Sequence, residues 1–176
     1  VAWDHARQRE LRLASEQFRG IAGQQASLVQ MHLNNIEVTL RGGVSLFAAV
    51  DQPTPEQWRG YVDGLRVQSR FPYVLGLGYA VYVDGRELTR LQEAWREDGR
   101  GLLEIRPRGH REHYGPILYM EPQSPENRGA VGFDMYSEAT RRSAMHAAMH
   151  SGRSQLSGRL VLMRDVANPE YSLVLY

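Results

Sequence analysis

The chain contains no cysteine, which excludes disulfide bonds, thiol catalysis and thiolate metal sites. It also lacks an excess of charge of either sign, because 21 basic and 20 acidic residues give a formal net charge of +1. We therefore expect no nucleic-acid partner. Long apolar runs are missing as well: a membrane span needs roughly 18 to 20 residues, and the nearest approach, 73–83, is interrupted by two glycines. The first residues have no signal-peptide layout.

What is present suits a folded domain. The chain has 176 residues, of which 42% are hydrophobic, enough for one globular domain with an appended element. It begins with Val1 rather than methionine, so we expect a fragment of a longer protein whose flanking membrane segments lie outside this sequence.

The first third of the chain carries a heptad-like apolar stripe. Its residues recur at steps of three, four or seven and are Leu11, Phe18, Ala22, Ala26, Val29, Leu33, Ile36, Leu40, Val44 and Phe47. The spacing predicts a helix from about residue 4 to residue 50, about 70 Å long at 1.5 Å per residue. So long a helix needs a partner helix or must run out of the domain. Gly42 and Gly43 predict a kink or break in its last third.

Residues 51–176 alternate short helices and strands. Thr54, Pro55 and Gln57 form a capping box that predicts a helix to about Arg70. Further helices are predicted at 86–99 and 137–150, and strands at 72–85, 101–107, 114–120, 130–133, 156–165 and 171–176. Residues 121–129 contain two prolines and predict a turn-rich connector. Single helices between short strands favour an α+β fold with an antiparallel sheet.

The histidines suggest a metal site, but their spacing does not support one. His146 and His150 share a helix face, and His110 and His113 lie in a loop. Neither pair has the His-Glu-x-x-His spacing of zinc proteases, so we interpret all four as surface histidines. No serine has the spacing of a nucleophile elbow, and the glycines at 76 and 78 lack the third glycine of a dinucleotide site. We therefore predict no catalytic residue, no metal ligand and no cofactor.

Three polar residues before and within the last predicted helix admit two interpretations each. Asp134 is either a helix cap or, if Ser137 takes that role, a carboxylate at a strand end that faces a ligand cleft. Arg141 and Arg142 are either a solvated face opposite Glu138 or a fork for a carboxylate or phosphate. The sequence favours the solvated face for the arginines and leaves Asp134 open.

The order and spacing of several residues from about 30 to 176 resemble a CHASE domain, the extracytoplasmic sensory module of bacterial receptors and plant cytokinin-receptor kinases. The residues that carry this resemblance are Phe47, Phe71, Pro72, Tyr79, Tyr114, Pro116, Glu121, Pro122, Gly132, Asp134, Gly152, Leu156 and Ser157. The resemblance implies a long dimerising helix followed by PAS-like units between two membrane spans. It also implies a ligand site in the membrane-distal unit, where an aspartate and a backbone group bind adenine in the plant receptors.

Transferred to this sequence, those two positions are Asp134 and Leu156. We add Tyr79, Tyr119 and Phe133 as apolar walls, although aromatic residues on strands are also ordinary core residues. The prediction is a long helix over 1–50, then a PAS-like antiparallel sheet flanked by helices over 51–176. It describes a non-enzymatic, periplasmic sensor of a membrane-anchored receptor, a histidine kinase or diguanylate cyclase, that binds a small, adenine-like molecule and forms a homodimer through the helix.

Two alternatives stay open at this stage. One is a ligand-free dimerising spacer, which the long helix supports equally well. The other is a metal-binding or hydrolytic protein that uses the histidines.

Overall fold

The computed structural model describes residues 2–50, 53–162 and 170–176. The chain divides into two compact units, residues 1–49 and 50–176. Each unit has its own architecture, and the second contains all strands that the structure describes.

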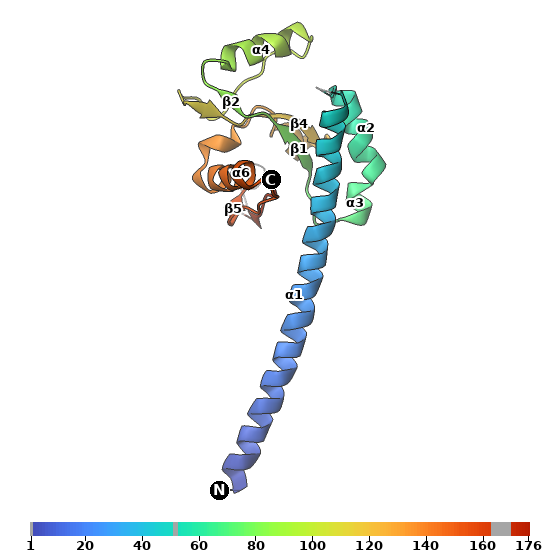
Figure 1. Ribbon diagram of the computed structural model, residues 1–176, viewed down its shortest axis with the longest axis vertical. Coiled ribbons are helices and arrows are strands. Elements are labelled where there is room, and N and C mark those ends of the chain that lie inside the picture. Colours follow the sequence, from blue (N-terminus) through green and yellow to red (C-terminus); the bar gives the residue numbers. More distant parts are fainter. Residues whose placement is uncertain (1, 51–52, 163–169) are drawn as a thin grey trace. The chain divides into compact units, whose positions relative to one another are not determined.

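The first unit is a single helix, α1 (Ala2–Val50; Figure 1). It confirms the predicted long N-terminal helix, but it stays helical through Gly42 and Gly43, so the expected break is wrong. Side-chain bonds reinforce the turns before the glycines and across them, because Arg41 pairs with Glu37 at 3.3 Å and Ser45 Oγ donates to the Arg41 carbonyl at 3.1 Å. None of the helices described is both long and apolar enough to cross a bilayer.

The second unit begins with α2 (Pro55–Leu65), which has the predicted capping box: Gln57 N donates to Thr54 Oγ1, and Gln57 Oε1 accepts from Thr54 N. The helix does not continue to Arg70 as expected. Arg66 adopts a left-handed conformation (φ 50°, ψ 48°), which ends α2 and starts the short α3 (Val67–Arg70). Buried Trp58 and Val62 give α2 an apolar side, and α2 packs on strand β4.

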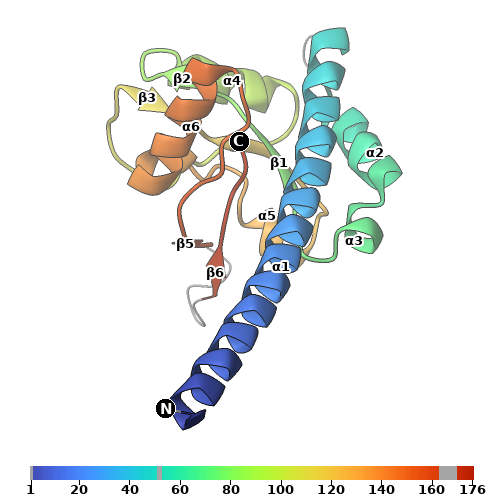
Figure 2. The same ribbon diagram turned by 60° about the horizontal axis from the view of Figure 1, so that its bottom comes forward.

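The strands form three small antiparallel pairs (Figure 2). β1 (Leu77–Ala80) pairs with β4 (Ile117–Glu121), β2 (Val83–Asp84) with β3 (His113–Tyr114), and β5 (Leu160–Val161) with β6 (Tyr171–Ser172). In the first pair Tyr79 lies opposite Tyr119, and the register then shifts so that Ala80 faces Ile117. The predicted mixed α+β class with antiparallel pairing is therefore confirmed.

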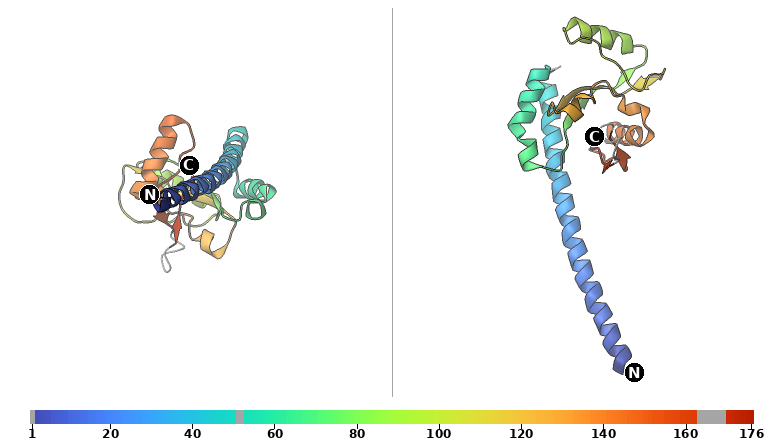
Figure 3. Two further views of the ribbon diagram at one scale, coloured as in Figure 1. Left: turned by 90° about the horizontal axis from the view of Figure 1, so that it is seen from below. Right: turned by 180° about the vertical axis from the view of Figure 1, so that it is seen from behind.

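The β1–β4 pair separates two hydrophobic clusters (Figures 1 and 3). On one side α4 (Leu88–Glu97) covers a cluster built on Leu103, Ile105, Tyr114 and Leu118. On the other side α6 (Ala139–Ser151) covers a cluster built on Ile117, Met135, Tyr136 and Met145. β4 contributes to both clusters without strict alternation, because its consecutive residues Leu118 and Tyr119 both belong to the α4 side, where the register with β1 shifts.

Several predicted boundaries are wrong for local reasons. The first strand begins at Leu77 rather than 72, since a turn closes with Val74 N bonded to the Phe71 carbonyl at 2.8 Å. Segments 101–107 and 130–133 contact each other but form no continuous ladder, and the one β-bridge between them in the described residues is the parallel bridge of Arg106 and Phe133. The connector contains a short helix, α5 (Pro125–Arg128). The strand predicted at 156–165 is reduced to β5, and its last residues lie outside the described part of the chain.

Candidate functional site

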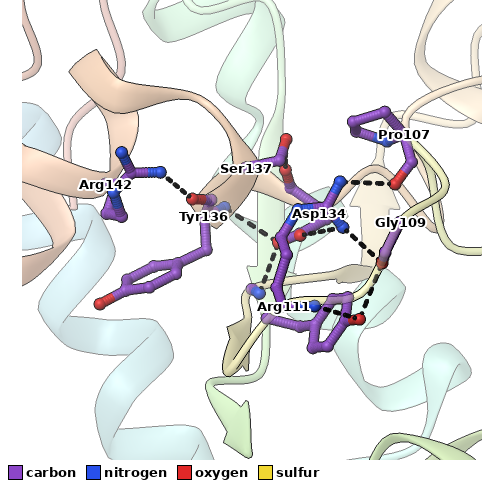
Figure 4. A network of polar contacts seen from close by, with 9 residues as sticks. Pro107, Gly109, Arg111, Asp134, Tyr136, Ser137 and Arg142 are labelled. Atoms are coloured by element: carbon purple, nitrogen blue, oxygen red, sulfur yellow. Dashed lines mark hydrogen bonds and ion pairs between the residues drawn. The ribbon is translucent and has the colours of Figure 1, made fainter. Parts of the chain in front are cut away.

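Asp134 is completely buried, with 0% of its surface exposed, and it connects three parts of the chain (Figure 4). Its Oδ1 accepts hydrogen bonds from Gly115 N at 2.7 Å and Tyr136 N at 3.0 Å. Its Oδ2 lies 3.3 Å from Arg111 Nη1 and has no hydrogen-bond partner among the described residues. We call Arg111, Gly115, Asp134 and Tyr136 the Asp134 network.

Arg111 extends this network into the loop 107–111. Its Nη2 donates to the Pro107 carbonyl at 2.8 Å, and its Nη1 donates to the Gly109 carbonyl at 3.3 Å. The Tyr114 hydroxyl also donates to the Gly109 carbonyl, at 2.9 Å. One guanidinium therefore binds two carbonyls of the loop and also faces the buried carboxylate.

The capping roles differ from those expected. Asp134 caps a single 3-10 turn, η1 (Met135–Ser137), while Ser137 Oγ donates to the Asp134 carbonyl at 2.6 Å and caps nothing. Glu138 caps α6 by accepting from Thr140 N and Arg141 N, both at 3.0 Å. Asp134 is thus a cap after all, of η1 rather than of α6, and its role toward a ligand stays a prediction.

The three predicted aromatic walls do not lie together. Tyr79 and Tyr119 contact each other, with 5.6 Å between ring centroids, and belong to the α4 side of the sheet. The Tyr119 hydroxyl accepts from Arg100 at 3.0 Å. Phe133 belongs to the cluster on the α6 side. The predicted walls are therefore divided between two clusters: Tyr79 and Tyr119 pair across β1 and β4, whereas Phe133 lies outside both strands.

Leu156 lies in a short ladder opposite Leu175 and is 40% exposed. The flanking residues carry the hydrogen bonds: Gln155 exchanges two bonds of 2.9 Å with Tyr176, and Ser157 N donates to the Val174 carbonyl at 2.7 Å. Leu156 is then a non-hydrogen-bonded position, so its own N–H and C=O point away from residues 174–176.

Arg141 is the residue that the sequence analysis placed wrongly. It is 5% exposed rather than solvated, and its guanidinium lies over the Phe133 ring at 5.3 Å. Ala144 and Met145, three and four positions further along α6, are also buried, so all three share the inner face. That spacing is the signal that could have identified it. Its neighbour Arg142 points elsewhere and donates to the Tyr136 carbonyl at 2.9 Å.

The histidines take part in an aromatic cluster. The Tyr136 hydroxyl is hydrogen-bonded to His146 Nε2, and Tyr82 stacks on His113 with 5.2 Å between centroids. Burial, followed by a hydrogen bond to Tyr82, raises the pKa of Tyr136 to about 12. Among the residues that the structure describes, no three histidine or carboxylate side chains converge as metal ligands.

A groove of about 300 Å³ lies between α4 and the segment 102–109. It is lined by Leu88, Gln92, Leu102, Leu103, Glu104, Ile105, Pro107, Arg108, Gly109 and Tyr114. None of the five predicted site residues is part of this lining, but the Asp134 network reaches it, because Arg111 binds the carbonyls of Pro107 and Gly109.

Comparison with known families identifies the second unit. Residues 51–176 match the CHASE domain family. The chain belongs to this family. CHASE domains are extracytoplasmic sensory domains of receptors, so the predicted sensory class is confirmed, and a non-enzymatic role and periplasmic placement agree with it. No curated protein matches the chain.

The CHASE match covers almost the same residues as the second compact unit, 50–176, and leaves α1 outside. The Asp134 network, Leu156 and Arg141 all lie within the matched CHASE residues.

Proposed function

We propose that this CHASE domain binds a small molecule on the extracytoplasmic side of a membrane-anchored receptor, a histidine kinase or diguanylate cyclase, and passes the signal through α1. The observation that supports the binding role is the buried Asp134, whose Oδ2 is paired only with Arg111 at 3.3 Å in the described structure. A ligand N–H group placed at Oδ2 would replace a guanidinium that also holds the loop 107–111.

This exchange gives the sensor two arrangements. In the first, which the structure describes, Arg111 faces Asp134 and binds the carbonyls of Pro107 and Gly109. With ligand, the donor takes Oδ2 and Arg111 is released toward solvent, which loosens the loop. A ligand shifts such an equilibrium only by the difference in its affinity for the two states, and that difference here is the hydrogen bond to Asp134.

A thermal-shift screen of the 176-residue chain tests the proposal, with purines, adenine derivatives, amino acids and small carboxylates as probes. A ligand at one hundred times its Kd adds about 2.7 kcal/mol of stability, on the order of 5 to 10 °C in Tm for a chain of this size. An adenine derivative is one expected hit, because the aspartate of the plant receptors binds adenine.

Two substitutions move the affinity in opposite directions. Asp134→Asn keeps an oxygen at Oδ1 but weakens the acceptor, so we expect at least about tenfold weaker binding. Arg111→Gln removes the competitor for Oδ2, so we expect tighter binding. A hit with the same Kd in both variants would show that Asp134 is no ligand anchor.

The second candidate function is a ligand-free dimerising spacer. The exposed apolar residues of α1, such as Leu11 at 61% and Phe18 at 72%, favour association and do not require a ligand. We propose a homodimer through α1 under either function. A screen without any hit, together with a dimer in solution, would favour the spacer.

A further inference from the structure

Arg141 is a buried cation whose charge is poorly matched by its neighbours. The residue is 5% exposed, and Glu138 is the one carboxylate paired with it in the described part of the chain. The distance from Arg141 Nε to Glu138 Oε2 is 3.8 Å, which is too long for a hydrogen bond.

Glu138 is already used elsewhere. Its two carboxylate oxygens accept the Thr140 and Arg141 backbone N–H groups that begin α6, and its side chain is 40% exposed. Water therefore screens much of its attraction for Arg141. A guanidinium carries five N–H donors. Tyr176 shares a side-chain hydrogen bond with Arg141, but a hydroxyl brings no charge, so the guanidinium has no anionic partner closer than Glu138 in the described part of the chain.

The other contacts of Arg141 are aromatic. Its guanidinium lies over Phe133 at 5.3 Å, and Tyr176 is on the same side of the sheet. Burial raises the pKa of Tyr176, and the adjacent Arg141 opposes that rise. The Tyr176 hydroxyl donates to Met135 Sδ at 3.7 Å, a weak acceptor, so it can turn to a better one at little cost.

The chain holds Tyr176 in this place through its backbone. Two backbone hydrogen bonds of 2.9 Å join Tyr176 to Gln155. Leu156, which follows Gln155, directs its backbone N–H and C=O away from residues 174–176. The Arg141 cluster, defined as Phe133, Glu138, Arg141 and Tyr176, thus combines a cation, a hydroxyl and an apolar ring.

We propose that Arg141 and Tyr176 bind the carboxylate of a small organic acid. This inference rests on the proposed sensory function and specifies the class of its ligand. A planar carboxylate accepts two parallel N–H bonds from a guanidinium, which supplies the partner that Glu138 does not. One buried cation matches a single negative charge, whereas Arg142, the next cation on α6, is engaged with the Tyr136 carbonyl. A phosphate dianion therefore fits less well.

The test compares acids with their neutral amides. Tm of the 176-residue chain is measured with acetate and benzoate against acetamide and benzamide, with sodium chloride holding the ionic strength constant. A carboxylate at ten times its Kd is expected to raise Tm by about 3 to 6 °C, and the amides are expected to leave it unchanged. Inorganic phosphate is included as a further probe.

Variants assign the effect to a residue. Arg141→Met is expected to abolish the rise, while Arg142→Met, one position along the same helix, retains it. Arg141→Lys keeps the charge without the planar fork, so we expect at least tenfold weaker binding. The Arg141→Lys variant also tests the assignment to Arg141 if the Arg141→Met variant does not fold.

Three results would overturn the inference: an equal rise with the amides, no rise with either acid, or an undiminished rise in the Arg141 variants. A phosphate effect larger than that of acetate and lost in Arg141→Met would assign the site to phosphate instead. If purines or other non-carboxylates bind in the wider screen while acetate and benzoate do not, the carboxylate inference fails and the sensory proposal stands.

Discussion

At the scale of the residue, Asp134 is buried and its carboxylate makes three contacts within the protein. We therefore expect its substitution to lower the stability of the fold, whether or not a ligand binds. Asp134→Ala leaves the N–H groups of Gly115 and Tyr136 without their acceptor and removes the carboxylate that pairs with Arg111. An unpaired buried N–H costs about 1 to 3 kcal/mol, so we expect a loss of about 3 to 5 kcal/mol in urea unfolding.

Asp134→Asn retains one acceptor oxygen, and its loss is expected to be smaller, about 1 to 3 kcal/mol. Asp63→Ala provides the control, because Asp63 is exposed on α2 and its loss should change stability by less than about 0.5 kcal/mol. If Asp134→Ala behaved like this control, the network would not stabilise the domain.

Tyr136 makes stability depend on alkaline pH. Its folded pKa is raised to about 12 by burial and by Tyr82, against about 10 in an unfolded chain. Below pH 10 the phenol is protonated in both states. Between pH 10 and 12 the unfolded state ionises first, so the free energy of unfolding must fall over this window.

The difference between the wild type and Tyr136→Phe isolates this group. We expect the alkaline fall to be smaller in the variant, and the difference in absorbance at about 295 nm to titrate near pH 12. A difference titration with its midpoint at pH 10 would contradict the raised pKa.

At the scale of the element, Gly132 fixes how segment 104–106 lies against residues 131–134. Its φ is +83°, and an added Cβ would lie 2.2 Å from the Glu104 carbonyl oxygen. Gly132→Ala therefore combines left-handed strain with a backbone clash, and we expect a loss of about 3 kcal/mol or more in chemical denaturation.

Gly152 supplies the matched comparison. It ends α6 with a φ of +61°, but an added Cβ meets nothing within 4 Å. Gly152→Ala should cost only the strain, about 1 to 2 kcal/mol. Equal losses of stability in the two variants would mean that the clash with the Glu104 carbonyl adds no cost at Gly132.

Elements defined by local chemistry were predictable, and those defined by distant partners were not. The capping box at Thr54 starts α2 as predicted, because all its atoms lie within one turn. Arg66 ends α2 in a left-handed conformation although it is neither glycine nor asparagine, the residues that usually adopt it. Segment 101–107 has a strand pattern, yet in the described structure Arg106 is its one residue in a β-bridge. The partner in that bridge is Phe133, which lies 27 positions further along the chain.

The candidate site shows the same division. Asp134 stood out in the sequence because a lone acid precedes a helix, but its contacts with Arg111 and Gly115 depend on how loops meet in space. The burial of Arg141 follows from the inner face it shares with Ala144 and Met145. The charge of Arg141 predicted an exposed side chain, whereas its helical spacing from Ala144 and Met145 predicts the buried position that the structure shows.

At the scale of the whole molecule, α1 presents large apolar side chains that association would bury. Leu11, Phe18 and Val29 are 61%, 72% and 58% exposed, and their spacing places them on one stripe of the helix. We expect sedimentation equilibrium to give a species of about twice 20.0 kDa at micromolar concentration.

Lysine substitutions test whether that stripe forms the interface. Replacing Leu11, Phe18 and Val29 by lysine removes about 1.5 to 3 kcal/mol of apolar burial per side chain and adds like charges across the seam, so Kd should rise at least about 100-fold. The matched control places three lysines elsewhere on α1, at Gln24, Ser27 and Asn34, which are exposed and off the stripe. A dimer that survives the first set, or dissociates equally with the second, would place the interface outside this stripe.

A ligand that binds the Asp134 network and changes the dimer constant of the wild type, but not that of Asp134→Asn, would connect the two units energetically, because coupled equilibria shift each other by the same factor.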